Sequence, residues 1–159
     1  MEGDDVDKEE RAVLITRYKE GHRAVVEAFR GITDDELDRS AGSEWTPRQI
    51  AHHLADSEMM SAIRIRRLLA EDNPVIHGYD EAEFAKRLTS DRPITPSLEA
   101  MRYARESTAQ LLERLSDDDW VRTGTHSESG PYSVETWLKI YAAHGHDHAA
   151  QVKRSRGIK

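Results

Sequence analysis

The stretch WTPRQIAHHLADSE, residues 45–58, contains the start signals of a long helix. Thr46 is a residue type that caps helices, Pro47 loses no needed donor at the first helical position, and Gln49 completes a capping box. Apolar and small side chains then recur at three- and four-residue intervals, at Ile50, Leu54, Ser57, Ser61, Ile65 and Leu68. This spacing predicts a helix over about 46–70 with one buried face.

Two adjacent histidines lie near the start of this helix, and their side chains point about 100° apart. His53 lies on the flank of the apolar face, whereas His52 points roughly opposite, on the side of Met59 and Ile63. We therefore favour His53 as the histidine that enters the core. His52, Met59 and Ile63 form a second apolar strip on the outer surface, and such strips often contact a partner chain. A homodimer is therefore a hypothesis.

Three more long helices are predicted from similar signals. Apolar residues at helical spacing indicate a first helix over about 8–30. Thr95 begins a third helix over about 95–115, and Ser133 is suited to cap a fourth over about 133–154. All four predicted helices therefore have a recognisable start, an apolar stripe, or both.

The connection between the second and third helices is much longer than an ordinary helix–helix loop. It covers about residues 71–95 and includes a short helical piece around 81–88. Because the chain has no alternating apolar and polar run of any length, we expect strands only as an incidental pair. Four long helices with one long central connection predict a single all-α domain over residues 1–159, a four-helix bundle with a crossover between helices two and three.

The fourth predicted helix carries two histidines, His144 and His148, that are four residues apart. On a helix they project about 40° apart and roughly 6 Å along the axis, so both imidazoles can bind one ion. The face that they share should be buried, because it also carries Trp137, Tyr141 and Val152. His146 falls on another face and is expected at the surface.

A third ligand would complete a metal site between two helices, and bundles build such sites from inward-facing side chains. The sequence has no cysteine, so only His, Asp and Glu remain as strong ligands. We predict that His53, His144 and His148 hold one divalent metal ion, zinc or nickel, since nitrogen donors bind both. The remaining histidines are assigned to the core or to loops: His22, His77 and His126.

The overall composition is that of a water-soluble protein. The chain has 159 residues, of which 37% are hydrophobic and 33% charged, and a formal net charge of −7. A membrane span needs about 20 consecutive apolar residues, and the sequence has no such run. The N-terminus is acidic rather than basic, so we expect no signal peptide and a cytoplasmic location. Because basic residues are scattered among acids, nucleic-acid binding is not expected.

Two segments resemble those of the DinB/YfiT family. Residues 45–58 resemble the family's tryptophan, helix start and metal histidine, followed by an Ala-Asp-Ser stretch. The segment YAAHGHDHAAQV, residues 141–152, resembles the family's paired histidines near the C-terminus. The resemblance extends over about residues 18–152 and implies a bundle of crossed connectivity that is often dimeric. It also implies the same three metal histidines that the helical geometry favours.

The family is described as metal-dependent hydrolases and includes bacterial thiol S-transferases. The resemblance therefore implies an enzyme with a small-molecule substrate, such as a low-molecular-weight thiol. Three neutral imidazoles and an open position lower the pKa of a metal-bound water to about 7, and a metal also deprotonates a bound thiol. The alternative is a non-catalytic binding or stress-response domain in which the metal is structural.

The residue that would move protons is not identified by the sequence. Asp56 and Glu58 are weak candidates, because both are favoured as solvent-facing helix residues. Asp147 is a candidate to hold the far nitrogen of a ligand histidine. The long connection, with His77 and Tyr79, forms either the wall of a pocket or a plain crossover.

Overall fold

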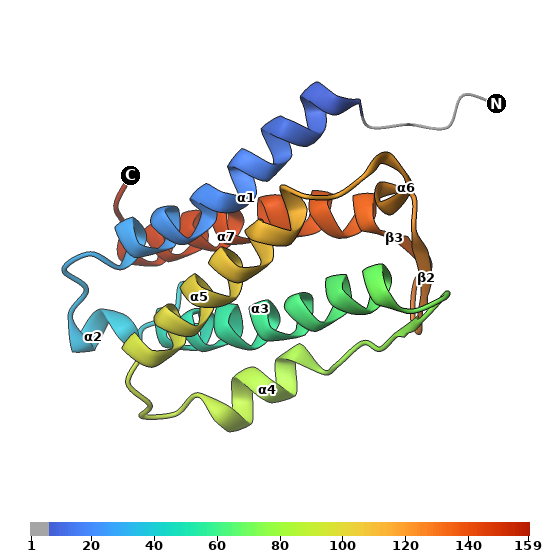
Figure 1. The fold of residues 1–159 in the computed structure, drawn as a ribbon. Helices are drawn as coiled ribbons and strands as arrows, with labels where there is room; N and C mark the ends of the chain where they lie inside the picture. The colour runs from blue at the N-terminus through green and yellow to red at the C-terminus, as the bar shows by residue number, and fades with distance from the viewer. Residues whose placement is uncertain (1–6) are drawn as a thin grey trace.

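The computed structural model describes residues 7–159, which form four long helices, three short helices and a small sheet (Figure 1). The long helices are α1 (Lys8–Phe29), α3 (Pro47–Ala70), α5 (Thr95–Leu112) and α7 (Val134–Arg156). The shorter elements are α2 (Asp34–Leu37), β1 (Val75–Ile76), α4 (Glu81–Leu88), α6 (Asp117–Trp120), β2 (Thr123–His126) and β3 (Gly130–Ser133).

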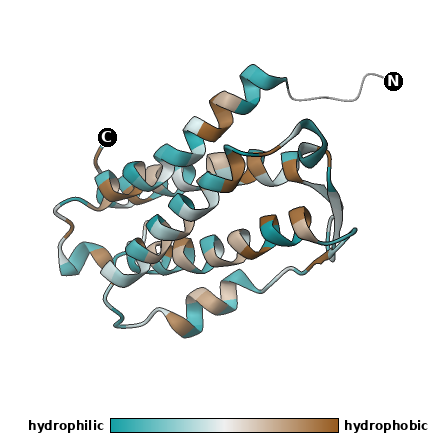
Figure 2. Ribbon diagram, viewed as in Figure 1, coloured by the Kyte–Doolittle hydropathy of each residue, from teal (hydrophilic) through white to brown (hydrophobic). Residues whose placement is uncertain are grey.

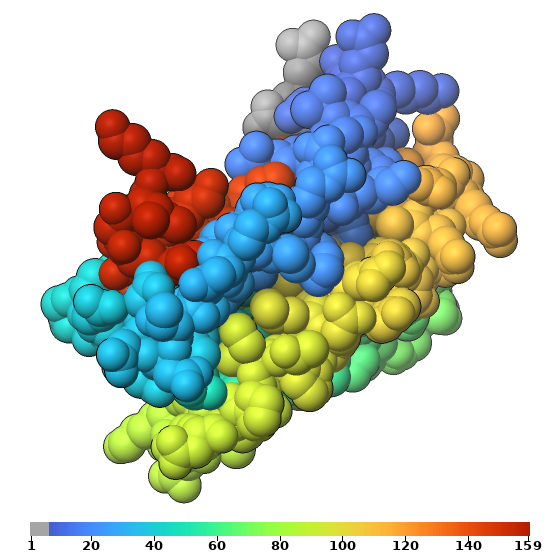
Figure 3. Space-filling model, turned by 90° about the vertical axis from the view of Figure 1, so that its left-hand side faces the viewer, coloured from blue at the N-terminus to red at the C-terminus, as the bar shows by residue number. Residues whose placement is uncertain are grey.

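The four long helices surround a common core. Helix α1 packs against α5 and α7, and α3 packs against the same two helices. Consequently α1 lies diagonally opposite α3, and α5 opposite α7. Figure 3 shows α1 beside α5 on one face of the molecule. The connection between α3 and α5 carries α4 along the outside of α3. The predicted four-helix bundle with a long crossover is therefore confirmed.

Hydrophobic and hydrophilic residues are interspersed along the long helices (Figure 2). The buried apolar residues form two clusters, one around Trp137 and the other around Leu54. Between the clusters, the helices carry buried polar residues, including Glu58 and Arg105. Within residues 7–159, no helix combines the length and the apolar character needed to cross a bilayer.

Helix α3 begins as the sequence predicts. The Thr46 hydroxyl accepts a hydrogen bond from the backbone N–H of Gln49 at 3.2 Å, and the Gln49 side chain accepts one from the Thr46 N–H at 2.9 Å. Both otherwise unpaired backbone donors are satisfied by this capping box. Pro47 occupies the first helical position, where its missing N–H has no cost.

Thr46→Ala is expected to lower the free energy of unfolding by about 1 kcal/mol, because the variant loses the hydroxyl that caps α3. Urea unfolding followed by circular dichroism measures the difference. Thr16→Ala is the matched control, since Thr16 is exposed in the middle of α1. Equal stability of the two variants would show that the cap contributes nothing.

The expectation of no more than an incidental strand pair is wrong. Strand β2 pairs in parallel with β1 and antiparallel with β3, which makes a three-stranded sheet. The strands have only two to four residues, too few for an alternating pattern to be recognised. Gly124 permits β2 to lie close to the residue before β1, because a Cβ at this position would lie 2.5 Å from the Pro74 carbonyl oxygen.

The third long helix, α5, begins at Thr95 as the sequence predicts, and its cap position, Ile94, makes no side-chain capping hydrogen bond. The other ends lie within about three residues of the predicted ones, since α7 ends at Arg156 and α5 at Leu112.

Candidate metal centre

Helices α3 and α7 bring three histidines together at one point. The Nε2 atoms of His53 and His144 are 3.3 Å apart, and those of His144 and His148 are 3.2 Å apart. One ligand atom from each residue lies within 4.8 Å of the others. The rings meet edge to face, with interplanar angles of 71° and 89° for these two pairs. The structure thus places the three predicted residues in one cluster.

The spacing of the three nitrogens can be compared with the geometry of a metal site. Two imidazole nitrogens that bind one tetrahedral zinc ion at about 2.1 Å are about 3.4 Å apart. The separations of 3.2 and 3.3 Å in the cluster are close to this value. The histidine cluster therefore has the size that one small divalent cation requires.

The three imidazoles are also in the charge state that metal binding requires. Burial lowers the pKa of His53 to about 4, and that of His144 to about 2, with the neighbouring histidines adding repulsion. Burial lowers the pKa of His148 as well. At neutral pH all three rings are uncharged, so each has a nitrogen lone pair available for a cation.

Contacts behind the cluster fix the orientation of two rings. Nδ1 of His148 donates to the side-chain oxygen of Gln151 at 2.9 Å, which leaves Nε2 free to bind a cation. The indole ring of Trp45 lies against His53, with 4.9 Å between the ring centroids. The candidate orienting role of Asp147 is wrong, because this residue is exposed and Gln151 makes the contact.

The position of α7 is set by a close helix crossing next to His144. A Cβ on Gly145 would lie 3.2 Å from the backbone of Gly21, so the two glycines allow α1 and α7 to touch. The same crossing brings Tyr18 of α1 against Trp137 of α7, with 5.4 Å between the ring centroids. The turn of α7 that carries His144 is therefore held by its contact with α1.

The two carboxylates considered as proton acceptors are not solvent-facing as expected. Glu58 is fully buried, and its Oε1 lies 2.9 Å from Nε of Arg105. Burial raises the pKa of Glu58, and Arg105 opposes that effect. Asp56 is half-buried, and burial raises its pKa too. Because Glu58 is buried and forms an ion pair with Arg105 in the core, a substrate cannot reach it.

The expected position of His52 is also wrong. This side chain is fully buried, with Nδ1 at 2.7 Å from the Ser97 hydroxyl and Nε2 at 3.1 Å from the Arg92 carbonyl oxygen. The residues after α4 cover this side of α3, so the strip has only two exposed apolar members. Met59 and Ile63 are 47% and 57% exposed.

The other histidines make local contacts outside the cluster. His22 is half-buried and bonds to the Leu98 carbonyl oxygen at 3.1 Å, as expected for a hydrogen-bonded core residue. His146 is partly exposed and bonds to the Arg17 carbonyl oxygen at 2.8 Å. Nδ1 of His126 accepts from the Glu128 N–H at 3.1 Å, and the His77 side chain is exposed.

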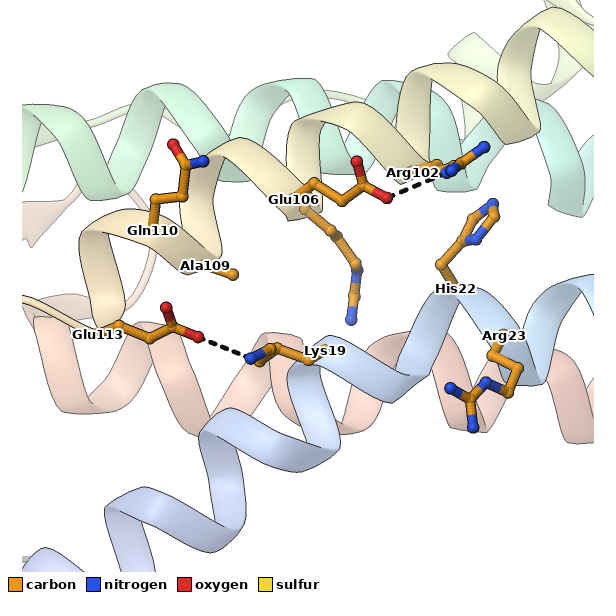
Figure 4. A pocket seen from close by; sticks show the side chains of 9 residues that line it. Lys19, His22, Arg23, Arg102, Glu106, Ala109, Gln110 and Glu113 are labelled. Atoms are coloured by element: carbon orange, nitrogen blue, oxygen red, sulfur yellow. Dashed lines mark hydrogen bonds and ion pairs between the residues drawn. The ribbon is translucent and has the colours of Figure 1, made fainter.

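Several cavities lie outside the histidine cluster among residues 7–159, and two of them are lined by residues of the long helices and the crossover. One, of about 550 Å³, runs between α1 and α5 and is bordered by the ion pairs Lys19–Glu113 and Arg102–Glu106 (Figure 4). The other, of about 630 Å³, is formed by α3, the start of the crossover and the β2–β3 hairpin. Tyr79 lines this second cavity, which contains none of the three cluster histidines, so a pocket wall at the metal site stays a prediction.

The fold and the cluster define a class of helical bundle proteins in which two helices share a three-histidine site. The family model described as "DinB superfamily" matches residues 17–152. The chain therefore belongs to the DinB superfamily, and the family predicted from its two histidine segments is confirmed.

The chain is similar to two proteins that are each named "Putative metal-dependent hydrolase". The protein from Oceanobacillus iheyensis is 41% identical over 122 residues, which cover 76% of this chain and 71% of the relative. The protein from Halalkalibacterium halodurans is 32% identical over 113 residues, which cover 71% of this chain and 66% of the relative. The matched segments thus span about two thirds of these relatives.

A solved structure shows the same fold. YfiT from Bacillus subtilis, described as "a probable metal-dependent hydrolase with an unusual four-helix bundle topology", superimposes with a TM-score of 0.91. The match covers 100% of this chain and 94% of that chain at 28% sequence identity. The bundle topology is therefore shared along the whole described chain.

Proposed function

We propose that this protein is a metal-dependent enzyme in which His53, His144 and His148 bind one divalent ion, zinc or nickel. The observation that carries this proposal is the convergence of three imidazole Nε2 atoms, with separations of 3.2 and 3.3 Å. The two relatives and YfiT, each named as a metal-dependent hydrolase, support the same assignment.

A divalent ion held in this way would activate either a water molecule for hydrolysis or a small thiol for transfer. The protein's own residues supply neutral nitrogen donors, and Gln151 keeps the His148 ring in its binding orientation. Among the described residues, the ligand group contains these three histidines and no carboxylate. A site with three protein ligands retains an open position, which favours catalysis over a purely structural metal.

The substrate in this proposal is a small molecule, for which a low-molecular-weight thiol is one candidate. A cytoplasmic location and the absence of nucleic-acid binding remain predictions from the sequence. A homodimer also remains a proposal, and its surface is reduced to Met59 and Ile63 because His52 is buried. Sedimentation at micromolar concentration measures the assembly state, and a monomer would contradict the dimer.

The first test is the metal content of the purified full chain, without an affinity tag, beside His53→Ala and His148→Ala. We expect about one metal per chain in the wild type and less than about one tenth of that in both variants, because each loses one of three ligands. His146→Ala is the matched control, since this histidine lies on α7 but outside the cluster.

The metal-loaded protein is then assayed for ester and amide hydrolysis and for thiol transfer. Turnover that disappears on chelation and returns with zinc or nickel supports the enzyme. If both variants retain metal, the three-histidine site is wrong. If metal binds in the cluster but only raises the melting temperature, without turnover of any substrate tested, the structural role is favoured.

A further inference from the structure

The cavity of about 630 Å³ at the hairpin end of the bundle, here called the Arg64 cavity, combines unpaired charges of both signs. It is lined by Arg64 of α3, by Tyr79 and Glu81 at the start of α4, and by His126 and Glu128 of the hairpin. Three segments that are far apart in the sequence therefore form it.

The Arg64 cavity lies along the same interface as the histidine cluster. Arg64 follows His53 by eleven residues, which places it on nearly the same face of α3 and about 16 Å along the axis. Tyr141 of α7 links the two places. Its ring centroid is 6.0 Å from that of His144, and its hydroxyl accepts from Nη1 of Arg64 at 3.0 Å.

The guanidinium of Arg64 is held in place without being neutralised. Nη1 donates to the Tyr141 hydroxyl, and Nη2 donates to the His77 carbonyl oxygen at 2.9 Å. Both partners are uncharged, and within residues 7–159 Arg64 has no carboxylate in ion-pair distance. An arginine has five N–H donors, so three remain for a planar anionic group such as a carboxylate.

Two carboxylates, those of Glu81 and Glu128, face the same cavity. Neither has an ion-pair partner in the described part of the chain. A Cβ on Gly78 would lie 2.8 Å from Cδ of Glu128, so this glycine makes room for the carboxylate. Burial raises the pKa of Glu81, Glu128 raises it further, and Arg64 opposes this effect. Asp80 differs, because its carboxylate caps α4 by accepting from the Glu83 N–H at 3.0 Å.

A further polar group lies beside Arg64, outside the lining of the cavity. Tyr132 is 3% exposed, and its buried hydroxyl lies close to Arg64 and the Tyr141 hydroxyl without well-formed hydrogen-bond geometry to either. A buried polar group without a partner is destabilising. A ligand that reaches this point would supply the missing partner.

We propose that the Arg64 cavity binds the zwitterionic end of the substrate, a carboxylate beside a primary ammonium, as in an amino acid. The carboxylate contacts Arg64, beside the buried Tyr132 hydroxyl, and the ammonium lies between Glu81 and Glu128. This assignment of substrate class rests on the proposed function, because it places the reacting end of the same substrate at the histidine cluster. Tyr141, which contacts both Arg64 and His144, lies beside the substrate between its two ends.

The test is a binding titration of the full chain by NMR with three probes of similar length: L-norvaline, n-butylamine and butyrate. L-norvaline should bind at least about 10-fold more tightly than either single-charge probe, since a hydrogen bond to a charged group is worth about 1.5–3 kcal/mol. Arg64→Gln and Glu81→Gln should each weaken L-norvaline binding at least about 10-fold. Arg87→Gln, an exposed charge of α4, is the control.

Equal binding of the three probes, or unchanged binding in both variants, would overturn the proposal. The cavity contains no ligand histidine, so L-norvaline should also bind the metal-free protein. Binding of L-norvaline by a chain that takes up no metal would therefore refute the proposed function and keep the zwitterion site. Metal uptake without L-norvaline binding would refute the zwitterion site and keep the proposed function.

The connection to the cluster is tested by loading the protein with cobalt. If the probe lies in the Arg64 cavity, the paramagnetic ion should shift the NMR signals of bound L-norvaline relative to the zinc-loaded protein. Binding without this shift would place the probe away from the α3–α7 interface and contradict the assignment.

Discussion

Arg105→Met is expected to lower the free energy of unfolding by about 3–5 kcal/mol, because it leaves a carboxylate buried without its ion-pair partner. Arg105 belongs to α5, is 2% exposed and contacts the other three long helices. Its Nε is 2.9 Å from Glu58 of α3, while Nη1 donates to the Tyr18 carbonyl oxygen at 2.6 Å and Nη2 to that of Tyr141 at 3.0 Å. The guanidinium also lies 4.4 Å from the centroid of the Tyr18 ring.

Urea unfolding of two further variants separates the buried charge from the general loss of an arginine. The double variant Arg105→Met, Glu58→Leu should regain about 2 kcal/mol or more, since the uncompensated carboxylate is gone. Arg102→Met removes an exposed arginine one turn earlier, which pairs with Glu106, and should cost at most about 1 kcal/mol. A loss for Arg105→Met no larger than this control would contradict the role of the guanidinium in joining the helices.

The long helices and the histidine cluster could be predicted because their signals are local and repeated. The capping box at Thr46 and Gln49 spans only four residues, and the apolar stripe of α3 extends over about five turns. His144 and His148 share a face by spacing alone. The small sheet lacks such a signal, since its strands are short and depend on Gly124 lying against Pro74.

The errors at His52 and Glu58 have one physical cause. The helical pattern of α3 was interpreted with a single buried face, which suits a helix at the surface of a bundle. In the structure α3 is covered by α5, α7 and α4, and Arg92 after α4 contacts His52 directly. Polar residues on the supposed outer side are therefore buried and need partners such as Ser97 and Arg105.

The surroundings of the cluster could not be predicted because they come from separate segments. Gln151 lies one turn after His148, so its contact could have been found from helical spacing. The Arg64 cavity differs, because it exists only where the crossover meets the β2–β3 hairpin. Neither the parallel pairing of β1 with β2 nor its register leaves a pattern in such short strands.

Acid is expected to destabilise the metal-free protein well above the pH at which carboxylates titrate. Burial and His148 lower the pKa of His53 to about 4 in the folded chain, whereas an unfolded histidine has a pKa of about 6.5. Below pH 6.5 the unfolded chain therefore binds protons that the folded chain does not, so stability falls as the pH decreases. The loss from His53 alone is about 2 kcal/mol between pH 6.5 and pH 5.

Urea unfolding of chelator-treated protein at pH 7, 6 and 5 measures this loss beside His53→Gln. The variant lacks the titrating ring, so its stability should fall by about 2 kcal/mol less than that of the wild type over the same interval. The carboxylates of Glu36 and Asp38, whose pKa values their arginine partners lower, act only at more acidic pH. Parallel pH profiles for wild type and variant would show that His53 is protonated in the folded chain, and the neutral cluster would then be wrong.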